Sequence, residues 1–344
     1  MIKYLICSKE EFYEFIENIK PEDNIAILTH TDLDGISSGI FLEEILKSKN
    51  LKIKIIRFIN YKKDLFSSLI KNLEKEKISK IFISDIGSDD PKDLENLREK
   101  FDVFWIDHHE FSKIENRKNI IKTESADCVG FVIYDLAEKF IDQEKWNWLV
   151  CATMVSEFSF KRKENLDFIK KYYNMNFENP FDSEPGEIAK RVSSALMYYK
   201  KDLKKVYKMV QNNDIDQIEE IHKIVQKEID LVVDYYWKNA EYFPKQGIYI
   251  CEINPKIAGP SVVSTIVSQA KPEDTHLIIN NMGEEFVKIS ARNQSDKKDM
   301  NKLVKLGIEG LKDSTGGGHP NASGAIIKRE DLEEFKDKIL TGNP

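Results

Sequence analysis

The sequence predicts an α/β protein with a mostly parallel, doubly wound sheet in its N-terminal domain, a helical connector and a smaller α/β C-terminal domain. Three observations support this fold class. Short apolar runs of strand length alternate with amphipathic stretches of helix length in the first third of the chain. A long amphipathic stretch then precedes a second set of strand-like runs. The length of 344 residues also suits two cores better than one.

The first elements alternate in a regular order. Strands are expected where short runs are apolar or alternate with polar residues, at 25–29, 52–58, 81–84 and 103–106. Helices are expected between them, at 37–49, 64–75 and 91–100. Asp64 is a candidate N-cap, and Pro91 lies at an expected helix start. A β-α-β-α order of this kind implies a mostly parallel sheet with helices on both faces.

The rest of the chain is first helical and then α/β again. The segment 130–213 is mainly of helical pattern, and 214–242 is a long amphipathic stretch that predicts a connecting helix. Residues 243–247 break that helix, and 248–250 begin the second α/β unit. We therefore expect three parts, with boundaries at 1–213, 214–246 and 247–344.

Composition and charge restrict the functions that the chain can have. The net charge of −7 makes broad, non-specific binding of duplex DNA less expected, because proteins of that class are usually basic. No apolar run approaches the roughly 18 to 20 residues of a membrane span, and the N-terminal residues do not resemble a signal peptide. The four cysteines form no CxxC pair, so a reducing, cytoplasmic location is expected.

Carboxylates and histidines follow three of the predicted strands. These residues are His30, Asp32 and Asp34 after the first strand, Asp85 after the third, and Asp107, His108 and His109 after the fourth. In open parallel sheets, ligands bind at the carboxyl ends of the strands, so the three segments are expected to converge. Aspartate and glycine in such positions are also common as helix caps and turn residues, which is the alternative interpretation of each segment alone.

A pair of divalent ions is the chemistry that suits such a cluster. Mixed carboxylate and imidazole ligands suit manganese, iron, cobalt or zinc, and the absence of thiolates argues against a structural zinc site. Two ions about 3.5–4 Å apart can clamp a phosphate, generate a hydroxide and stabilise the leaving oxygen. One carboxylate must bridge the ions, and Asp85 is a candidate for that role.

The three segments resemble motifs I, II and III of the DHH phosphoesterase superfamily, which includes RecJ-type exonucleases, oligoribonucleases, cyclic-dinucleotide phosphodiesterases and manganese pyrophosphatases. The resemblance implies two divalent ions, with manganese expected and magnesium or cobalt as alternatives. One ion would be held by His30, Asp32 and Asp85. The other would be held by Asp34, Asp85 and His108. His30 departs from the spacing of some members, in which the histidine lies four residues before the first aspartate rather than two.

The same resemblance assigns roles to three further residues. His109 would contact the substrate phosphate, and Asp107 would brace the site from behind the ligands. The family also has an acidic ligand about fifty residues after the DHH triplet, and here Glu157 lies 49 residues after His108. The family residue is usually aspartate, so Glu157 is a longer substitute. Its alternative interpretation is an exposed glutamate at a helix end.

A glycine-rich segment near the C-terminal end is the second concentrated signal. Consecutive glycines at Gly316, Gly317 and Gly318 allow a backbone to approach phosphate oxygens closely, and His319 adds a side-chain donor or acceptor. A flexible turn is the alternative interpretation. The segment resembles the GGGH motif of the DHH-associated C-terminal domain, which implies substrate binding. Arg292, on a predicted strand, resembles the family arginine that grips a phosphate or base, although it could also be a surface residue.

The predicted function is that of a metal-dependent phosphoesterase, most specifically an exonuclease (a nuclease and hydrolase) that cleaves single-stranded DNA or RNA with a metal-activated water. Basic clusters at 161–163, 200–205 and 297–305 could line a groove for a strand, although such runs are usually solvated helix faces. Aromatic residues such as Phe158 and Phe160 could stack bases, but burial in the core is the expectation. An oligoribonuclease, dinucleotide or cyclic-dinucleotide phosphodiesterase is the alternative.

Partner classes follow from that function. Single-stranded DNA, RNA or short oligonucleotides are the expected substrates, while a homo-oligomer and proteins of DNA repair or replication are open partner classes. A scaffold without activity is a third interpretation, which the presence of all the aspartates and histidines of the three motifs argues against.

Overall fold

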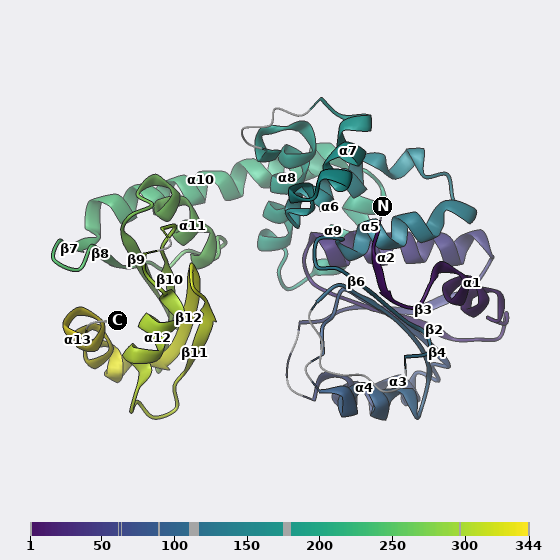
Figure 1. Cartoon of the computed structure of the whole chain (residues 1–344), viewed down its shortest axis with the longest axis horizontal. Helices are drawn as coiled ribbons and strands as arrows, with labels where there is room; N and C mark the ends of the chain where they lie inside the picture. The colour runs from purple at the N-terminus through teal and green to yellow at the C-terminus, as the bar shows by residue number, and fades with distance from the viewer. Residues whose placement is uncertain are drawn as a thin grey trace. The chain divides into compact units, whose positions relative to one another are not determined.

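The computed structural model describes residues 2–60, 62, 64–88, 90–109, 117–174, 180–295 and 297–342. These residues form two compact units, 1–219 and 220–344. The predicted fold class is confirmed, because a mostly parallel six-stranded sheet forms the first unit, a helical region follows, and a second α/β sheet forms the second unit (Figure 1). The functional division at 213/214 and 246/247 stays a prediction.

The sheet of the first unit has the order β1-β6-β5-β4-β2-β3. Its strands are β1 (Tyr4–Ile6), β2 (Ile25–Thr29), β3 (Ile53–Phe58), β4 (Lys80–Ser84), β5 (Asp102–Asp107) and β6 (Ile120–Thr123). The strands from β6 to β3 are parallel, and β1 is added antiparallel to β6 at one edge. The carboxyl ends of β2, β4 and β5 therefore lie side by side at one end of the sheet.

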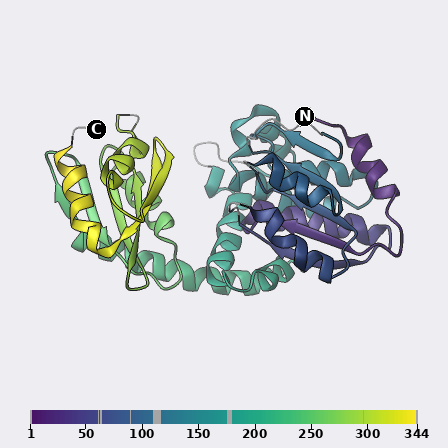
Figure 2. The same ribbon diagram turned by 90° about the horizontal axis from the view of Figure 1, so that it is seen from below.

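Helices cover both faces of this sheet (Figures 1 and 2). The helices of this unit are α1 (Lys9–Glu17), α2 (Leu33–Ser48), α3 (Leu65–Lys75), α4 (Pro91–Arg98), α5 (Val129–Leu136), α6 (Asn147–Ser156), α7 (Lys163–Tyr172), α8 (Glu184–Tyr198) and α9 (Leu203–Gln211). Of these, α6 to α9 pack mainly against α2, α5 and one another. Because strand side chains alternate between faces, Leu28 and Ile83 pack in the core formed with α3 and α4. Phe82 and Phe104 point the other way and contact Phe12 of α1 edge to face.

Several boundaries differ from the predictions for physical reasons. The helix α2 begins at Leu33, four residues before the predicted start, because Asp32 caps it through the Gly35 amide. Asp64 does stand at the N-cap position of α3, but its backbone is left-handed (φ 54°) and its side chain forms no capping bond within the described residues. The strands β1 and β6 were not predicted, since β1 has three residues and β6 has only four, of which Lys122 and Thr123 are polar.

The sheet of the second unit has the order β11-β12-β10-β9-β8-β7. Its strands are β7 (Glu241–Phe243), β8 (Ile248–Glu252), β9 (Thr275–Met282), β10 (Phe286–Arg292), β11 (Thr315–His319) and β12 (Ala322–Lys328). The pair β8 and β9 is parallel, and the other neighbours are antiparallel. The helices are α10 (Ile215–Asn239), which contains the boundary between the units, α11 (Pro260–Ala270), α12 (Met300–Ile308) and α13 (Leu332–Thr341).

Helices lie on both faces of this second sheet as well. On one face, Val287 and Ile289 of β10 pack with Leu303 of α12 and Phe335 of α13. On the other face, Tyr249 of β8 belongs to a smaller cluster with side chains of α10 and α11. Within the part of the chain that the structure describes, none of the helices combines the length and apolar character that crossing a membrane requires.

Candidate metal centre

The turn between β2 and α2 presents the first two candidate ligands. The carboxylate of Asp32 accepts a hydrogen bond from the Gly35 amide at 3.0 Å through Oδ1. Its Oδ2 lies 2.6 Å from Nδ1 of His30. A Cβ atom at position 35 would lie 2.3 Å from the carbonyl oxygen of His30, so this tight turn requires the glycine. The turn therefore holds His30 and Asp32 together at the end of the strand.

Asp34 lies in the first turn of α2 and points at the start of another helix. Its two carboxylate oxygens accept hydrogen bonds from the amides of Gly130, at 2.6 Å, and Val129, at 2.8 Å, at the N-terminus of α5. The residue is 1% exposed. A Cβ atom at position 130 would lie 3.0 Å from Oδ1 of Asp34 and 2.3 Å from Oγ of Ser37, so only glycine allows this approach of the two helices.

Asp85 follows β4 and is central to the cluster. Its backbone is left-handed (φ 59°), and the residue is 2% exposed. The His30 Nδ1 atom lies 3.6 Å from its Oδ2, and the His108 Nε2 atom lies 3.5 Å from its Oδ1. The buried Oδ2 has no hydrogen-bond partner among the described residues. A buried carboxylate oxygen without a donor is costly, which indicates that a cation belongs beside it.

Asp107, the last residue of β5, is followed by two histidines whose rings have different partners. The Nδ1 atom of His108 lies 3.1 Å from the carbonyl oxygen of Ser125, which can only accept, so this nitrogen carries the proton. The Nε2 atom is then free to bind a metal, and it lies 4.0 Å from Oδ2 of Asp34. His109 is held differently, because its Nδ1 atom lies 2.8 Å from Oδ1 of Asp107. The three segments predicted to converge do lie together.

Two groups of candidate ligand atoms share one residue. The ligand atoms of His30, Asp32 and Asp85 lie within 4.8 Å of one another. Those of Asp85, His108 and His109 do so as well. The first group matches the residues that the family resemblance gives to one ion. The second includes His109, which the resemblance gives to the substrate phosphate instead. In both groups Asp85 stands where a bridging carboxylate is needed.

Burial and mutual repulsion change the acidity of these carboxyl groups. Burial, followed by the neighbouring charges of Asp34 and Asp32, raises the pKa of Asp85 well above its ordinary value. Burial also raises the pKa of Asp34. By contrast, the hydrogen bond and charge of His30 outweigh burial at Asp32 and lower its pKa. Negative charge therefore exceeds positive charge in a buried place, and the residues present fit divalent cations.

Glu157 lies at the end of α6, directly after Ser156. Burial, and then the charges of Asp34 and Asp32, raise the pKa of Glu157 to about 8. The side chain therefore feels the same electrostatic field as the cluster. It does not belong to either of the two tightest groups of ligand atoms in the described residues. Its role as a ligand stays a prediction.

A buried lysine beside Asp107 was missed by the sequence analysis. Lys122 of β6 is 0% exposed and forms an ion pair with Asp107. Although burial alone would raise it, the hydrogen bond from His109 and the charge of Lys122 hold the pKa of Asp107 at about 2. The only sequence signal was that Lys122 directly follows Ile120 and Ile121, and its burial is unusual because lysine is almost never fully buried unless paired.

The glycine-rich segment of the second unit forms a strand rather than a flexible turn. Gly316 to His319 belong to β11, the edge strand, which pairs antiparallel with β12. A Cβ atom at Gly318 would lie 2.6 Å from the carbonyl oxygen of Ala322. Glycine at this position therefore lets the two strands approach closely.

Arg292 and His319 project from the same face of the second sheet. His319 is the register partner of Ala322, and Ala322 is the register partner of Arg292. Because directly opposite residues point to the same face, only the small Ala322 separates the two polar side chains. The half-buried Arg292 has no ion pair among the residues that the structure describes, and burial lowers its pKa. Both side chains are thus available to an anion.

The aromatic residues after α6 are not core residues, so the expectation of burial is wrong for Phe158. Its side chain is 49% exposed and its backbone is left-handed (φ 56°). The Lys161 Nζ atom lies 4.9 Å from the centre of its ring. Arg162, from the same basic run, is instead bound to the buried Asp127 at 2.7 Å.

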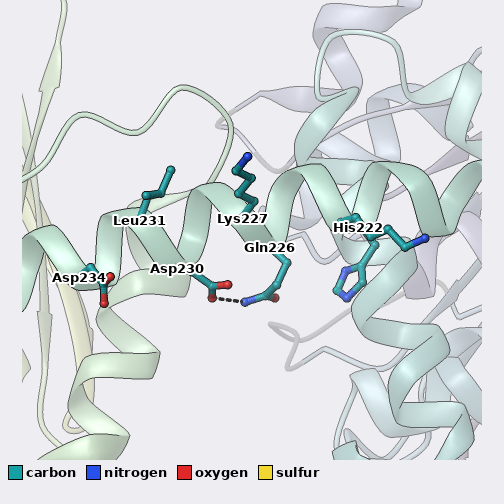
Figure 3. A pocket seen from close by; sticks show the side chains of 7 residues that line it. His222, Gln226, Lys227, Asp230, Leu231 and Asp234 are labelled. Atoms are coloured by element: carbon teal, nitrogen blue, oxygen red, sulfur yellow. Dashed lines mark hydrogen bonds between the residues drawn. The ribbon is translucent and has the colours of Figure 1, made fainter.

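A shallow depression lies along α10, lined by seven residues between His222 and Asp234 (Figure 3). Within it, Gln226 Nε2 donates a hydrogen bond to Asp230 Oδ1 at 2.7 Å. All seven residues belong to one helix, and none of the predicted site residues is among them.

Two family models match the chain. One is described as the DHH family, N-terminal domain, and matches residues 24–173. The other is described as the DHHA1 domain and matches residues 248–341. No curated protein matches the chain by sequence. The first match contains every candidate ligand from His30 to Glu157, and the second contains Arg292 and the glycine segment.

Solved structures of similar fold include two of RecJ. The exonuclease RecJ bound to manganese superposes with a TM-score of 0.73 at 13% identity, over 98% of this chain and 94% of that one. RecJ from Thermus thermophilus in complex with Mn²⁺ gives 0.67 at 14% identity, over 96% of this chain and 54% of that one. An exopolyphosphatase-related protein from Bacteroides fragilis gives 0.54 at 15% identity, over 97% and 96%. At these identities the likeness shows the fold alone.

Proposed function

Because the chain contains a DHH family N-terminal domain and a DHHA1 domain, we propose that it is a metal-dependent phosphodiesterase. The proposed activity is that of an exonuclease that removes nucleotides from single-stranded DNA or RNA. The observation that carries the proposal is Asp85, a buried carboxylate with an unpartnered oxygen that both groups of candidate ligands share. A carboxylate shared by two groups of candidate ligands is suited to bridge a pair of cations.

The residues of the centre have separable tasks in this proposal. Two divalent ions, with manganese preferred, would supply a water of lowered pKa and charge to stabilise the developing oxyanion. His30, Asp32 and Asp85 would hold one of them. Asp34 and His108, again with Asp85, would hold the other. Glu157 could contribute as well, because the charges of Asp34 and Asp32 act on its carboxyl group.

The remaining polar residues would bind and orient the substrate. His109 is partly exposed, and the hydrogen bond to Asp107, which outweighs burial, raises its pKa. A protonated His109 would donate to a phosphate oxygen, held in direction by Asp107. In the second unit, Arg292 and His319 share one face of the sheet and offer donors to a further phosphate.

Two observations support nucleic acid as the substrate class. The exposed ring of Phe158 follows Glu157 directly in the chain, and single-strand binding proteins stack bases on such rings. Lys161, beside that ring, is a cation of the kind that follows a phosphate backbone. The similar fold of RecJ, an exonuclease whose structure contains manganese, supports the same class.

Substitution of Asp85 tests the metal mechanism. Asp85→Asn keeps the shape of the side chain but removes the shared charge, and hydrolysis should fall by about 10³-fold or more, as it does when a key electrostatic group is lost. A chelator should abolish the activity of the wild type, and Mn²⁺ should restore it. The matched control is Asp93→Asn, a buried carboxylate that accepts two backbone hydrogen bonds in the same unit. This variant should lower the free energy of unfolding but leave the rate of hydrolysis unchanged. Full activity in a chelator would refute the mechanism.

Substrate length separates the exonuclease from the alternative. End-labelled single strands of about 20 nucleotides, a length that exceeds the site sizes of single-strand binding folds, are compared with a dinucleotide and a cyclic dinucleotide. Stepwise shortening of the long strand supports the exonuclease and gives its direction. Cleavage restricted to the dinucleotides would refute it in favour of an oligoribonuclease or dinucleotide phosphodiesterase.

A further inference from the structure

We propose that Lys122 is a positioning residue of the active centre, which acts through Asp107 to hold the ring of His109 toward the substrate. The proposal rests on the proposed phosphodiesterase function and adds a residue that none of the family motifs contains. Lys122 does not touch the candidate metal ligands of the first group. Within the residues that the structure describes, its contacts include Asp107, the backbone of His109 and the ring of Trp105.

The register of the sheet brings Lys122 to Asp107. The two residues are direct partners on the neighbouring parallel strands β5 and β6. The Lys122 Nζ atom pairs with Oδ2 of Asp107, and it donates a second hydrogen bond to the carbonyl oxygen of His109 at 3.3 Å. The other carboxylate oxygen, Oδ1, bonds the ring of His109 at 2.8 Å. The lysine therefore fixes both the carboxylate that orients His109 and the backbone that carries it.

An aromatic ring closes the arrangement from the other side. Trp105 lies two residues before Asp107, so its side chain is on the same side of the strand, and the Lys122 Nζ atom lies 4.2 Å from its ring centre. The indole nitrogen of Trp105 donates to the carbonyl oxygen of Ile86 at 2.9 Å. Gly87 follows, and a Cβ atom there would lie 3.2 Å from Cβ of His109. Trp105 thus holds the loop after Asp85 through Ile86, and the same loop packs against His109 at Gly87.

A second lysine provides an internal comparison for this arrangement. Lys80 and Asp102 are also register partners on neighbouring parallel strands, and they form an ion pair at 2.5 Å. The Lys80 Nζ atom likewise lies over an aromatic ring, that of Phe15, at 5.1 Å. This pair lies at the opposite end of the strands, and the side chain of Asp102 is 49% exposed. The chain therefore contains two lysine–aspartate pairs between neighbouring strands, of which the Lys122–Asp107 pair is hydrogen-bonded to a histidine.

The experiment compares Lys122→Met with Lys80→Met in the full chain. With Lys122→Met, kcat should fall by about 10- to 100-fold, the loss usual when a supporting partner of an active-site group is removed. The affinity for Mn²⁺, measured by calorimetric titration, should change by less than about threefold, because the candidate metal ligands stay in place. Lys80→Met should leave kcat unchanged. An unchanged kcat in Lys122→Met, or an equal loss in Lys80→Met, would overturn the proposal.

The double variant Asp107→Asn with Lys122→Met separates positioning from stability, because it leaves no buried charge without a partner. If Lys122 acts through Asp107, the kcat of the double variant equals that of the more damaged single variant. A loss equal to the product of the two single losses would overturn the proposal. The double variant also serves if Lys122→Met alone does not fold.

Histidine-selective NMR of the metal-free protein gives a readout that does not depend on catalysis. The Nδ1 proton signal of His109, assigned with His109→Gln, should be shielded from exchange in the wild type and in Lys80→Met. It should be lost in Lys122→Met, and an unaltered signal there would contradict the proposal. If the wild type hydrolyses no phosphodiester, the proposed function fails, while this measurement still decides whether Lys122 orients His109.

Discussion

The surroundings of individual carboxyl groups shift their pKa values in opposite directions in this protein. Asp107 has a cation and two donors around it, so its pKa is about 2. Asp34, Asp85 and Glu157 are buried near one another, and burial raises the pKa of each. The first arrangement is stable by itself, whereas the second stores repulsion that a cation would relieve. The metal-free protein should therefore depend on pH in a characteristic direction.

We predict that the metal-free protein loses stability as the pH rises from about 5 to 8. The pKa of Glu157 is about 8 in the folded state and near 4.5 in the unfolded chain. The folded state thus binds the proton more tightly, so protonation stabilises it below pH 4.5, and that stability is lost as the pH rises through 8. Asp34 and Asp85 contribute with the same sign. Melting temperatures of the chelated protein should fall over this range.

Glu157→Gln should make that pH dependence shallower, because the amide does not titrate. The exposed Glu74→Gln is the control and should follow the wild type. Adding Mn²⁺ should remove most of the slope, since metal binding displaces the protons. A melting temperature that is flat between pH 5 and 8 in the chelated wild type would contradict the prediction.

The candidate ligands could be predicted from the sequence because each stands at a recognisable place. Aspartates and histidines that directly follow apolar runs are expected at strand ends, and the topology then brings them together. The contact of Asp34 with the amides of Val129 and Gly130 could not be predicted, since it depends on how two helices pack across 95 residues of chain. Lys122 was missed because a lysine inside a strand is usually assumed to face solvent.

Among the helices and strands, too, some could be predicted from the sequence and others could not. The strands β2, β4 and β5 lie close to their predicted ranges because strands buried on both faces are continuously apolar. The helix α2 begins earlier than predicted because Asp32 and Asp34 act as its cap and first turn while also facing the centre. The glycine segment was predicted to bind substrate, with a flexible turn as the alternative, and the pairing with β12 that makes it a strand depends on residues that follow it.

The strand β11 provides a prediction about substrate binding. Gly318→Ala places a Cβ atom 2.6 Å from the carbonyl oxygen of Ala322, so β11 and β12 must separate. Overpacking of this kind costs about 1–3 kcal/mol, measurable by denaturant titration. The KM for an oligonucleotide should rise, while Mn²⁺ affinity stays unchanged because the ligands lie in the other unit.

The control for that change is Gly310→Ala. This glycine has a left-handed backbone (φ 78°) with nothing near its missing Cβ atom, so the substitution tests backbone strain without overpacking. It should cost only about 1 kcal/mol and leave the KM as in the wild type. If both variants raise the KM equally, the close approach of β11 to β12 is not what the substrate requires.

At the scale of the whole molecule, each unit has a core of its own. The candidate ligands all belong to residues 30–157, inside the first unit. A ligand that binds only the folded state stabilises the part that binds it, by about 2.7 kcal/mol at a hundredfold excess over Kd. Scanning calorimetry should therefore show two transitions, of which Mn²⁺ raises the first unit's alone. A single transition that shifts as a whole would show that the units unfold together.

The hydrogen bonds from Val129 and Gly130 to Asp34 have a consequence for metal uptake. Backbone amides hold this carboxylate in the absence of an ion, so this part of the proposed coordination shell would be preorganised in the metal-free protein. An arriving cation then has little chain to rearrange. Stopped-flow mixing of the apoprotein with Mn²⁺ should show uptake without a lag, at a rate proportional to the ion's concentration. The concentration of free cations, rather than a rearrangement of the chain, would then set the rate of metal uptake.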